Sequence, residues 1–253
     1  MWNLYEDLLR PIPEGIVVER AILGATWSFV LAKKEKEEYF GIASSILLPG
    51  PSQEKLNWSG ADLKDLAGKI KSWNFKEASL ALAAINAFYQ SKENIENIKN
   101  NSDYQLISDQ DAFLAYKSQA ENKKIAFIGH FHSLENYLDK DSDLIVLEKE
   151  PKTGDYPDSA AEFLLADRNI VFITASTLIN KTLPRLLELT KHAKVILSGP
   201  SSPLTPILFE YGIKESSGFI IENHEKAAKI IASGEHKRVF QQGQKVRLLK
   251  SNK

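Results

Sequence analysis

The chain has 253 residues, of which 43% are hydrophobic and 26% charged, a composition typical of globular proteins with a sizeable core. Its formal net charge of -1 gives no overall attraction to nucleic acid or to an anionic membrane, so we expect neither as a partner. The absence of cysteine excludes disulfides and thiolate metal sites. The sequence has neither the roughly 20 apolar residues that cross a bilayer nor a signal-peptide pattern, which predicts a cytoplasmic protein.

The first hundred residues predict a small α+β domain. A first helix should end at Pro11, and apolar segments at 16–23, 27–31 and 39–43 indicate three strands in an antiparallel meander. Two helices are expected at 61–72 and 75–90, the second with a face of alanine and leucine suited to close packing. Strands followed by helices are typical of an α+β unit.

A polar segment then separates this domain from the rest of the chain. Residues 91–108 are rich in Asn, Lys, Glu and Ser with few large apolar side chains, which favours a linker. We therefore predict a domain boundary near residue 100, with one domain at 1–100 and a second, carrying most of the site, at 101–253.

The second domain contains four short apolar runs, at 125–128, 144–147, 170–173 and 194–197. Runs without alternation indicate strands that are buried on both faces, as in a parallel sheet covered by helices. Helices are expected between and after them at 109–120, 133–138, 159–165, 183–191, 203–211 and 224–233. This alternation predicts an α/β, Rossmann-like, doubly wound domain, whose ligands bind beyond the carboxyl ends of the strands.

The dinucleotide-binding and Walker sequences are absent, so an ordinary NAD or ATP site is not expected. Instead, ionisable residues follow the first two runs. His130 and His132 have a spacing compatible with chelation of one metal ion, while Glu148 ends an otherwise apolar strand and Asp155 lies in a turn. The alternatives are histidines that bond neighbouring carbonyls, a carboxylate that faces water, and an aspartate that bonds its own turn.

Hydroxyl-rich loops follow the other two runs. They contain more polar side chains than a helix cap requires, which favours a site for an anion or another polar ligand, although stiff crossover loops would have the same form. The candidate ligand-binding residues are Thr174, Ser176, Thr177 and Asn180 in the first loop and Gly199, Ser201 and Ser202 in the second.

Several stretches in the same order resemble a known family, the "putative heavy-metal chelation" proteins of domain of unknown function 364, with their N-terminal domain of unknown function 4213. The matching stretches are 78–87, 128–131, 146–148 with Pro151, 154–157, 173–180, and 199–204 with Tyr211 and Gly212. The resemblance covers nearly the whole chain. It implies an N-terminal domain similar to that of enolases, a Rossmann-like C-terminal domain, and a site in the cleft between them.

The leading hypothesis is a protein that binds a divalent metal ion or a small-molecule metal chelate in this cleft. The candidate metal ligands are His130, His132, Glu148 and Asp155. Whether it is an enzyme stays open; a metal chelatase would use His130 or Glu148 as the catalytic group that accepts the chelator's protons. The alternatives are a transferase or lyase acting on a small anionic metabolite, with His130 as general base, and a non-catalytic ligand sensor. The oligomeric state also stays open.

Overall fold

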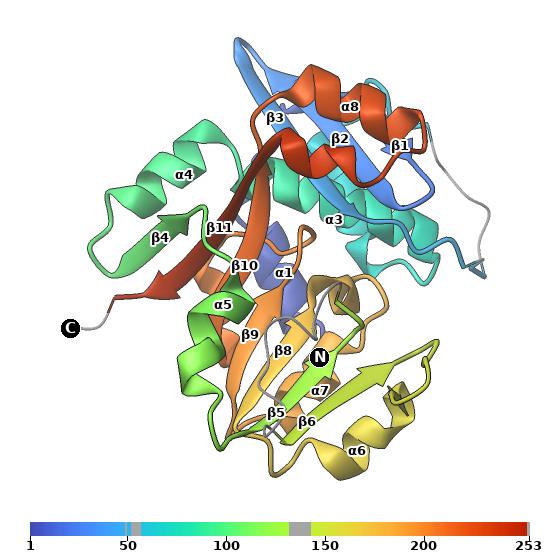
Figure 1. Ribbon diagram of the computed structural model, residues 1–253. Helices are drawn as coiled ribbons and strands as arrows, with labels where there is room; N and C mark the ends of the chain where they lie inside the picture. Colours follow the sequence, from blue (N-terminus) through green and yellow to red (C-terminus); the bar gives the residue numbers. More distant parts are fainter. Residues whose placement is uncertain (49, 52–56, 132–142, 252–253) are drawn as a thin grey trace.

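The structure is a computed structural model that describes residues 1–48, 50, 51, 57–131 and 143–251. It contains two sheets, a three-stranded antiparallel one near the N-terminus and an eight-stranded, mostly parallel one that follows (Figure 1). This confirms the predicted α/β class with a small domain followed by a larger Rossmann-like domain. The likeness of the small domain to the enolase N-terminal domain stays a prediction.

The small sheet is a meander of β1 (Val17–Leu23), β2 (Trp27–Lys34) and β3 (Glu37–Ser44). One face packs against α3 (Phe75–Tyr89), of which all but two residues are buried. The approach is close because β3 carries Gly41, where an added Cβ would lie 2.1 Å from the backbone nitrogen of Ala87. The remaining short helices of this region are α1 (Asn3–Leu9), α2 (Leu63–Gly68) and η1 (Lys69–Lys71).

The other face of the small sheet is covered by a helix from the far end of the chain. Helix α8 (His224–Ala232), orange-red in Figure 1, lies across the sheet on the side opposite α3. Its Ile231 belongs to one buried cluster with Phe29 and Phe40 of the small sheet and with Phe219. The C-terminal part of the sequence therefore completes the core of the N-terminal sheet.

The large sheet has the order β4-β11-β10-β9-β8-β5-β6-β7. The strands from β10 to β7 run parallel, whereas β11 is antiparallel to both β10 and β4. Its strands are β4 (Tyr104–Ser108), β5 (Lys124–Ile128), β6 (Asp143–Glu148), β7 (Tyr156–Pro157), β8 (Ile170–Thr174), β9 (Lys194–Ser198), β10 (Ile213–Ile221) and β11 (Gly243–Lys250). The four predicted buried strands are thus confirmed as β5, β6, β8 and β9, which lie side by side.

Short helices connect these strands. They are α5 (Ala112–Tyr116), η2 (Lys117–Gln119), η4 (Asp158–Ala160), α6 (Ala161–Leu164), η5 (Ala175–Leu178), α7 (Leu183–Leu189), η6 (Pro206–Tyr211) and η7 (Arg238–Gln241). The helix expected at 133–138 lies outside the described residues. The other expected helices have counterparts here, and the one expected at 203–211 is the 3-10 helix η6.

The segment expected to be a linker has regular structure. Residues 91–108 form α4 (Lys92–Lys99) and β4, and β4 pairs with β11 at the edge of the large sheet. Helix α4 buries Ile95 and Ile98 in a cluster with Val246 and Leu248 of β11. Its polar composition is therefore that of a helix with one buried stripe, not of a linker. The boundary near residue 100 stays a prediction.

Candidate functional site

The predicted polar clusters lie at one edge of the large sheet. Residues Ile128, Leu147 and Ile173 are in register at the ends of β5, β6 and β8. Thr174 is in register with Ser198 at the end of β9. Because these four strands are parallel, their following loops all leave from the carboxyl edge, which is where α/β sheets bind ligands.

A glycine sets the course of the chain after β5. Gly129 has φ of +99°, a conformation that favours glycine, and its N–H donates to the carbonyl of Leu147 at 2.9 Å. An added Cβ there would lie 2.8 Å from Cγ2 of Thr174 on the neighbouring strand β8. The bend therefore requires glycine, and it places His130 beside the end of β6.

His130 meets both of the carboxylates that the sequence predicted as site residues. Its backbone N–H donates to Oε2 of Glu148 at 2.7 Å, and its Nδ1 lies 3.2 Å from Oδ2 of Asp155. The Asp155 side chain is 7% exposed and that of His130 is 23% exposed. The same Asp155 oxygen accepts from the backbone N–H of Lys152 at 3.0 Å, which holds the carboxylate in its turn.

These contacts leave an imidazole nitrogen of His130 available to a ligand, whereas the two carboxylates bond neighbouring groups of the chain. A carboxylate on Nδ1 orients the imidazole and leaves Nε2 as the nitrogen for a ligand, as in carboxylate–histidine–metal arrangements. Glu148 accepts backbone N–H groups on both oxygens, since Lys149 donates to Oε1 at 2.7 Å. His132 lies outside the described residues. Among the described residues, no group of three or more His, Asp or Glu is placed to hold a metal ion.

The loop after β8 is largely bonded to itself. The hydroxyl of Thr177 donates to the carbonyl of Thr174 at 2.6 Å, and Oδ1 of Asn180 accepts from the backbone and hydroxyl of Thr182. Thr174 and Ser176 share a hydroxyl contact of 3.0 Å. Both are half-buried, so each retains hydrogen-bonding capacity toward the edge of the sheet.

The loop after β9 joins the two sheets. Ser201 accepts a hydrogen bond from the backbone N–H of Ser44 in β3 at 2.8 Å, and its carbonyl accepts from Asn86 of α3 at 3.0 Å. The hydroxyl of Ser202 contacts that of Ser216 at 3.0 Å. Gly199, with φ of +108°, turns the chain after β9. The contacts of Ser201 join the two domains, whereas those of Ser202 lie within the large-sheet domain, and a ligand role for either serine stays a prediction.

Two polar residues at this edge were not among the predicted site residues. Ser198 is 2% exposed, and its hydroxyl has no hydrogen-bond partner within the described chain. Lys181 lies half-buried with its Nζ 5.3 Å from the centre of the Phe75 ring, and burial lowers the pKa of its amine to about 8. Both residues lie in the polar clusters of the sequence. Only the three-dimensional contacts reveal that the Ser198 hydroxyl has no partner among the described residues and that the Lys181 amine is desolvated.

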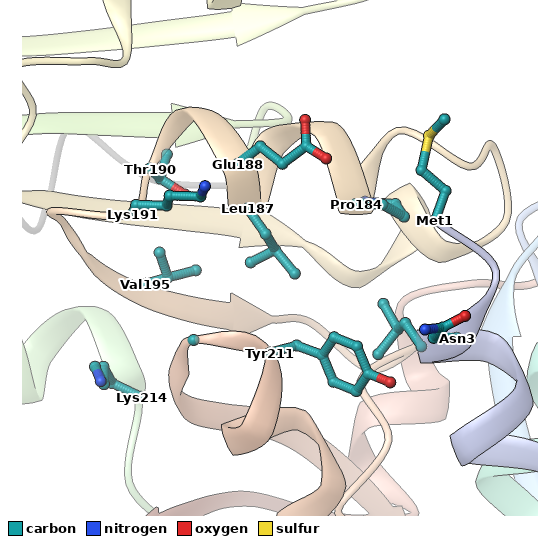
Figure 2. A pocket seen from close by; sticks show the side chains of 12 residues that line it. Met1, Asn3, Pro184, Leu187, Glu188, Thr190, Lys191, Val195, Tyr211 and Lys214 are labelled. Atoms are coloured by element: carbon teal, nitrogen blue, oxygen red, sulfur yellow. The ribbon is translucent and has the colours of Figure 1, made fainter.

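A cavity of about 340 Å³ lies at the opposite edge of the sheet. It is lined by α1, α7 and the starts of β9 and β10, with Leu187, Val195 and Tyr211 around it (Figure 2). Its lining, drawn from the described residues, includes none of the predicted ligands. The predicted residues therefore form an open edge of the sheet, separate from this cavity.

Comparisons with known proteins agree with this architecture. Residues 111–250 match the DUF364 family and residues 5–89 match DUF4213, both with the description "Putative heavy-metal chelation". An uncharacterized protein of Methanocaldococcus jannaschii is 29% identical over 230 residues, which are 87% of this chain and 85% of that protein.

Two crystal structures from the DUF364 family, both of proteins with unknown function, are also similar. One, from Desulfitobacterium hafniense, is 36% identical with a TM-score of 0.88 and coverage of 99% of both chains. The other, from Pyrococcus horikoshii, is 21% identical with a TM-score of 0.82 and coverage of 98% of both chains. No helix in the described ranges is long and apolar enough to cross a membrane. The chain belongs to the DUF364 family, as the resemblance in its sequence predicted.

Proposed function

We propose that this member of the DUF364 family binds a small-molecule metal chelate at the carboxyl edge of the large sheet, in the cleft between the domains, as a cytoplasmic protein. The observation that carries the proposal is the pairing of His130 with Asp155, with 3.2 Å between Nδ1 and Oδ2. This pairing favours the tautomer in which Nε2 is free to coordinate a metal. The family description of heavy-metal chelation supports the same chemistry.

A chelate fits the described residues better than a bare metal ion. A structural zinc ion is held by four protein ligands and a catalytic one by three, whereas the described residues offer no such group. One imidazole nitrogen is sufficient when a chelator supplies the remaining ligands. In this proposal His130 is the protein ligand, and Asp155 and Glu148 position it.

The hydroxyl groups along the same edge would bind the polar groups of the chelator. Ser198 is buried without a partner, and an unpaired buried hydroxyl is costly until a ligand or water meets it. Thr174, at the end of β8, is in register with Ser198, and Ser176 of η5 contacts the Thr174 hydroxyl. Thr177, Asn180, Ser201 and Ser202 instead hold the loops in place through the bonds described above.

If the protein is an enzyme, the same geometry suits metal insertion or removal. A chelator releases protons when it takes up a metal, and an imidazole oriented by a carboxylate is a suitable acceptor. Glu148 lies beside the His130 backbone and is the second candidate acceptor. A chelatase is therefore the enzymatic form of the proposal, and simple binding is the non-enzymatic form.

A second candidate function is a transferase or lyase acting on a small anionic metabolite. The observation in its favour is Lys181, whose amine is half-buried in the loop that follows β8. A cation at the carboxyl edge would bind a carboxylate or phosphate, and the His130–Asp155 pair would serve as a general base. This candidate requires no metal, which separates it from the first.

Calorimetric titration would test the proposal directly. We would titrate the metal-stripped protein with Zn²⁺, Ni²⁺ and Co²⁺, each alone and as its tetrapyrrole complex, and with inorganic phosphate and small carboxylates. The matched control for His130→Ala is His192→Ala, an exposed histidine between α7 and β9. We expect chelate binding that weakens at least tenfold in His130→Ala and is unchanged in His192→Ala. Binding of anions without any metal chelate would instead support the metabolite candidate.

A further inference from the structure

A second cavity, of about 260 Å³, lies between the two sheets and away from the candidate metal site. Its lining comes from β3 of the small sheet, from the end of α3, from α4, from the start of α8, and from β4, β10 and β11 of the large sheet. The volume is slightly below the roughly 300 Å³ at which pockets for drug-sized ligands begin. It therefore suits a small metabolite, or the ring of a larger one.

The cavity contains a buried amide without a partner. Gln90 lines it and is 8% exposed, yet neither its amide nitrogen nor its amide oxygen has a hydrogen-bond partner in the part of the chain that the structure describes. An amide offers a donor beside an acceptor, and leaving both unpaired inside a protein is costly. A ligand that offers an acceptor beside a donor would satisfy both atoms at once.

Aromatic rings form another wall. Phe40 stacks on Phe29 with 5.4 Å between ring centres, and His224 stacks on Phe40 at 4.9 Å with an angle of 8° between the rings. Both Phe40 and His224 line the cavity, together with Ile95 of α4. A wall of stacked rings and aliphatic side chains favours a planar, weakly polar group.

The exposed rim carries two lysines, Lys92 and Lys99 of α4, which have no ion-pair partner among the described residues. The two carboxylates of the rim are engaged. Glu38 lies 3.1 Å from Nδ1 of His224, and Glu222 accepts from the amide of Gln244 at 2.7 Å. Glu38 also pairs with Lys33 at 3.5 Å, whereas the Gln244 amide leaves the charge of Glu222 in place. Two lysines therefore face one uncompensated carboxylate, and the net positive charge of the rim suits an anionic group.

We propose that this cavity binds a small organic anion with a planar heterocycle, of the class represented by a purine nucleoside monophosphate. The amide of Gln90 would bond the N6 and N7 atoms of adenine, a pairing that glutamine makes through its two amide atoms. The ring would lie against His224, whose imidazole stacks on Phe40, and the phosphate would meet Lys92 and Lys99. The proposal is independent of the metal chelate, because the two sites share no residue.

The test is calorimetric titration of the full chain, without metal, using AMP, GMP, adenosine and inorganic phosphate as probes. We expect AMP to bind more tightly than either adenosine or phosphate alone. Gln90→Leu replaces the glutamine with a side chain of similar size. It should weaken the binding of AMP at least tenfold and raise the thermal midpoint of the free protein, since it removes an unpaired amide.

Surface variants keep the test valid even if Gln90→Leu folds poorly. The double variant Lys92→Gln/Lys99→Gln should weaken the binding of AMP at least tenfold and leave the binding of adenosine unchanged. The control, Lys191→Gln at the rim of the other cavity, should change neither ligand. The proposal is overturned if AMP fails to bind at millimolar concentration, or if it binds the α4 double variant as tightly as the wild type.

Discussion

Glu215 and Arg247 form a buried ion pair in the large sheet, and its contribution to stability can be measured. Glu215 of β10 is 0% exposed, and the Arg247 side chain of β11 is 8% exposed. The pair is bidentate, with 2.7 Å from Nε to Oε1 and 2.6 Å from Nη2 to Oε2. The hydroxyl of Tyr116 donates to the same carboxylate at 3.0 Å, which joins α5 to the two strands.

The change Arg247→Met would leave the Glu215 carboxylate buried with a single hydroxyl as partner. Removal of one partner from a buried pair costs about 3–5 kcal/mol, because the other charge remains uncompensated. For a chain of this length, each kcal/mol lowers the thermal midpoint by about 2–4 °C. We therefore expect Arg247→Met to lower the midpoint by roughly 10 °C.

Thermal unfolding followed by circular dichroism would measure the shift of the midpoint, and urea unfolding would measure the loss of free energy, with Lys250→Met as control. Lys250 is an exposed residue of the same strand, and exposed ion pairs contribute little. The double variant Glu215→Leu/Arg247→Met should regain most of the loss, since an apolar pair of similar volume removes the unpaired charge. Unfolding of Arg247→Met at the wild-type urea concentration, or a double variant no more stable than the single one, would show that the buried pair does not stabilise the sheet in this way.

Three further predictions follow from individual contacts. Gly41→Ala should lower the unfolding free energy by about 3 kcal/mol or more in urea titrations, because its Cβ would meet the backbone of Ala87 at 2.1 Å. Burial lowers the pKa of the Lys181 amine to about 8, so the unfolded chain keeps the ammonium proton to a higher pH than the folded protein does. The contribution of Lys181 to the free energy of unfolding therefore becomes more favourable as the pH rises above 8. The urea midpoint should therefore rise less between pH 7 and 9.5 in Lys181→Met than in the wild type. Finally, Asp155→Asn should weaken the binding of a metal chelate by about tenfold in calorimetry while the fold is retained, because an amide orients His130 less strongly than a carboxylate; unchanged affinity would remove Asp155 from the account.

The arrangement of the site edge could be predicted from sequence because it depends on short-range pattern. Runs such as 170–173, apolar at every position, indicate strands buried on both faces, and parallel strands bring their following residues to one edge. Gly129 and His130 were placed in this way, at the end of β5.

The remaining features depend on long-range contacts that no local pattern contains. Residues 91–108 appeared to be a linker because β4 is stabilised by β11, more than a hundred residues away in the sequence. Strand β10 was not predicted, since its buried Glu215 is paired with Arg247 and interrupts the apolar pattern. The hydroxyl of Ser201, a predicted ligand residue, contacts Ser44 of the other domain, and no local pattern indicates that contact. In each case the partner lies far along the chain.

The most direct test of the proposed function is X-ray absorption at the zinc edge, measured on the protein with a bound zinc tetrapyrrole. We expect one additional nitrogen ligand from an imidazole at about 2.0–2.1 Å. This ligand should be present in the wild type and in His192→Ala, and absent in His130→Ala. A spectrum of the bound chelate that shows no protein nitrogen, or one that His130→Ala leaves unchanged, would contradict the assignment of His130 as the metal ligand.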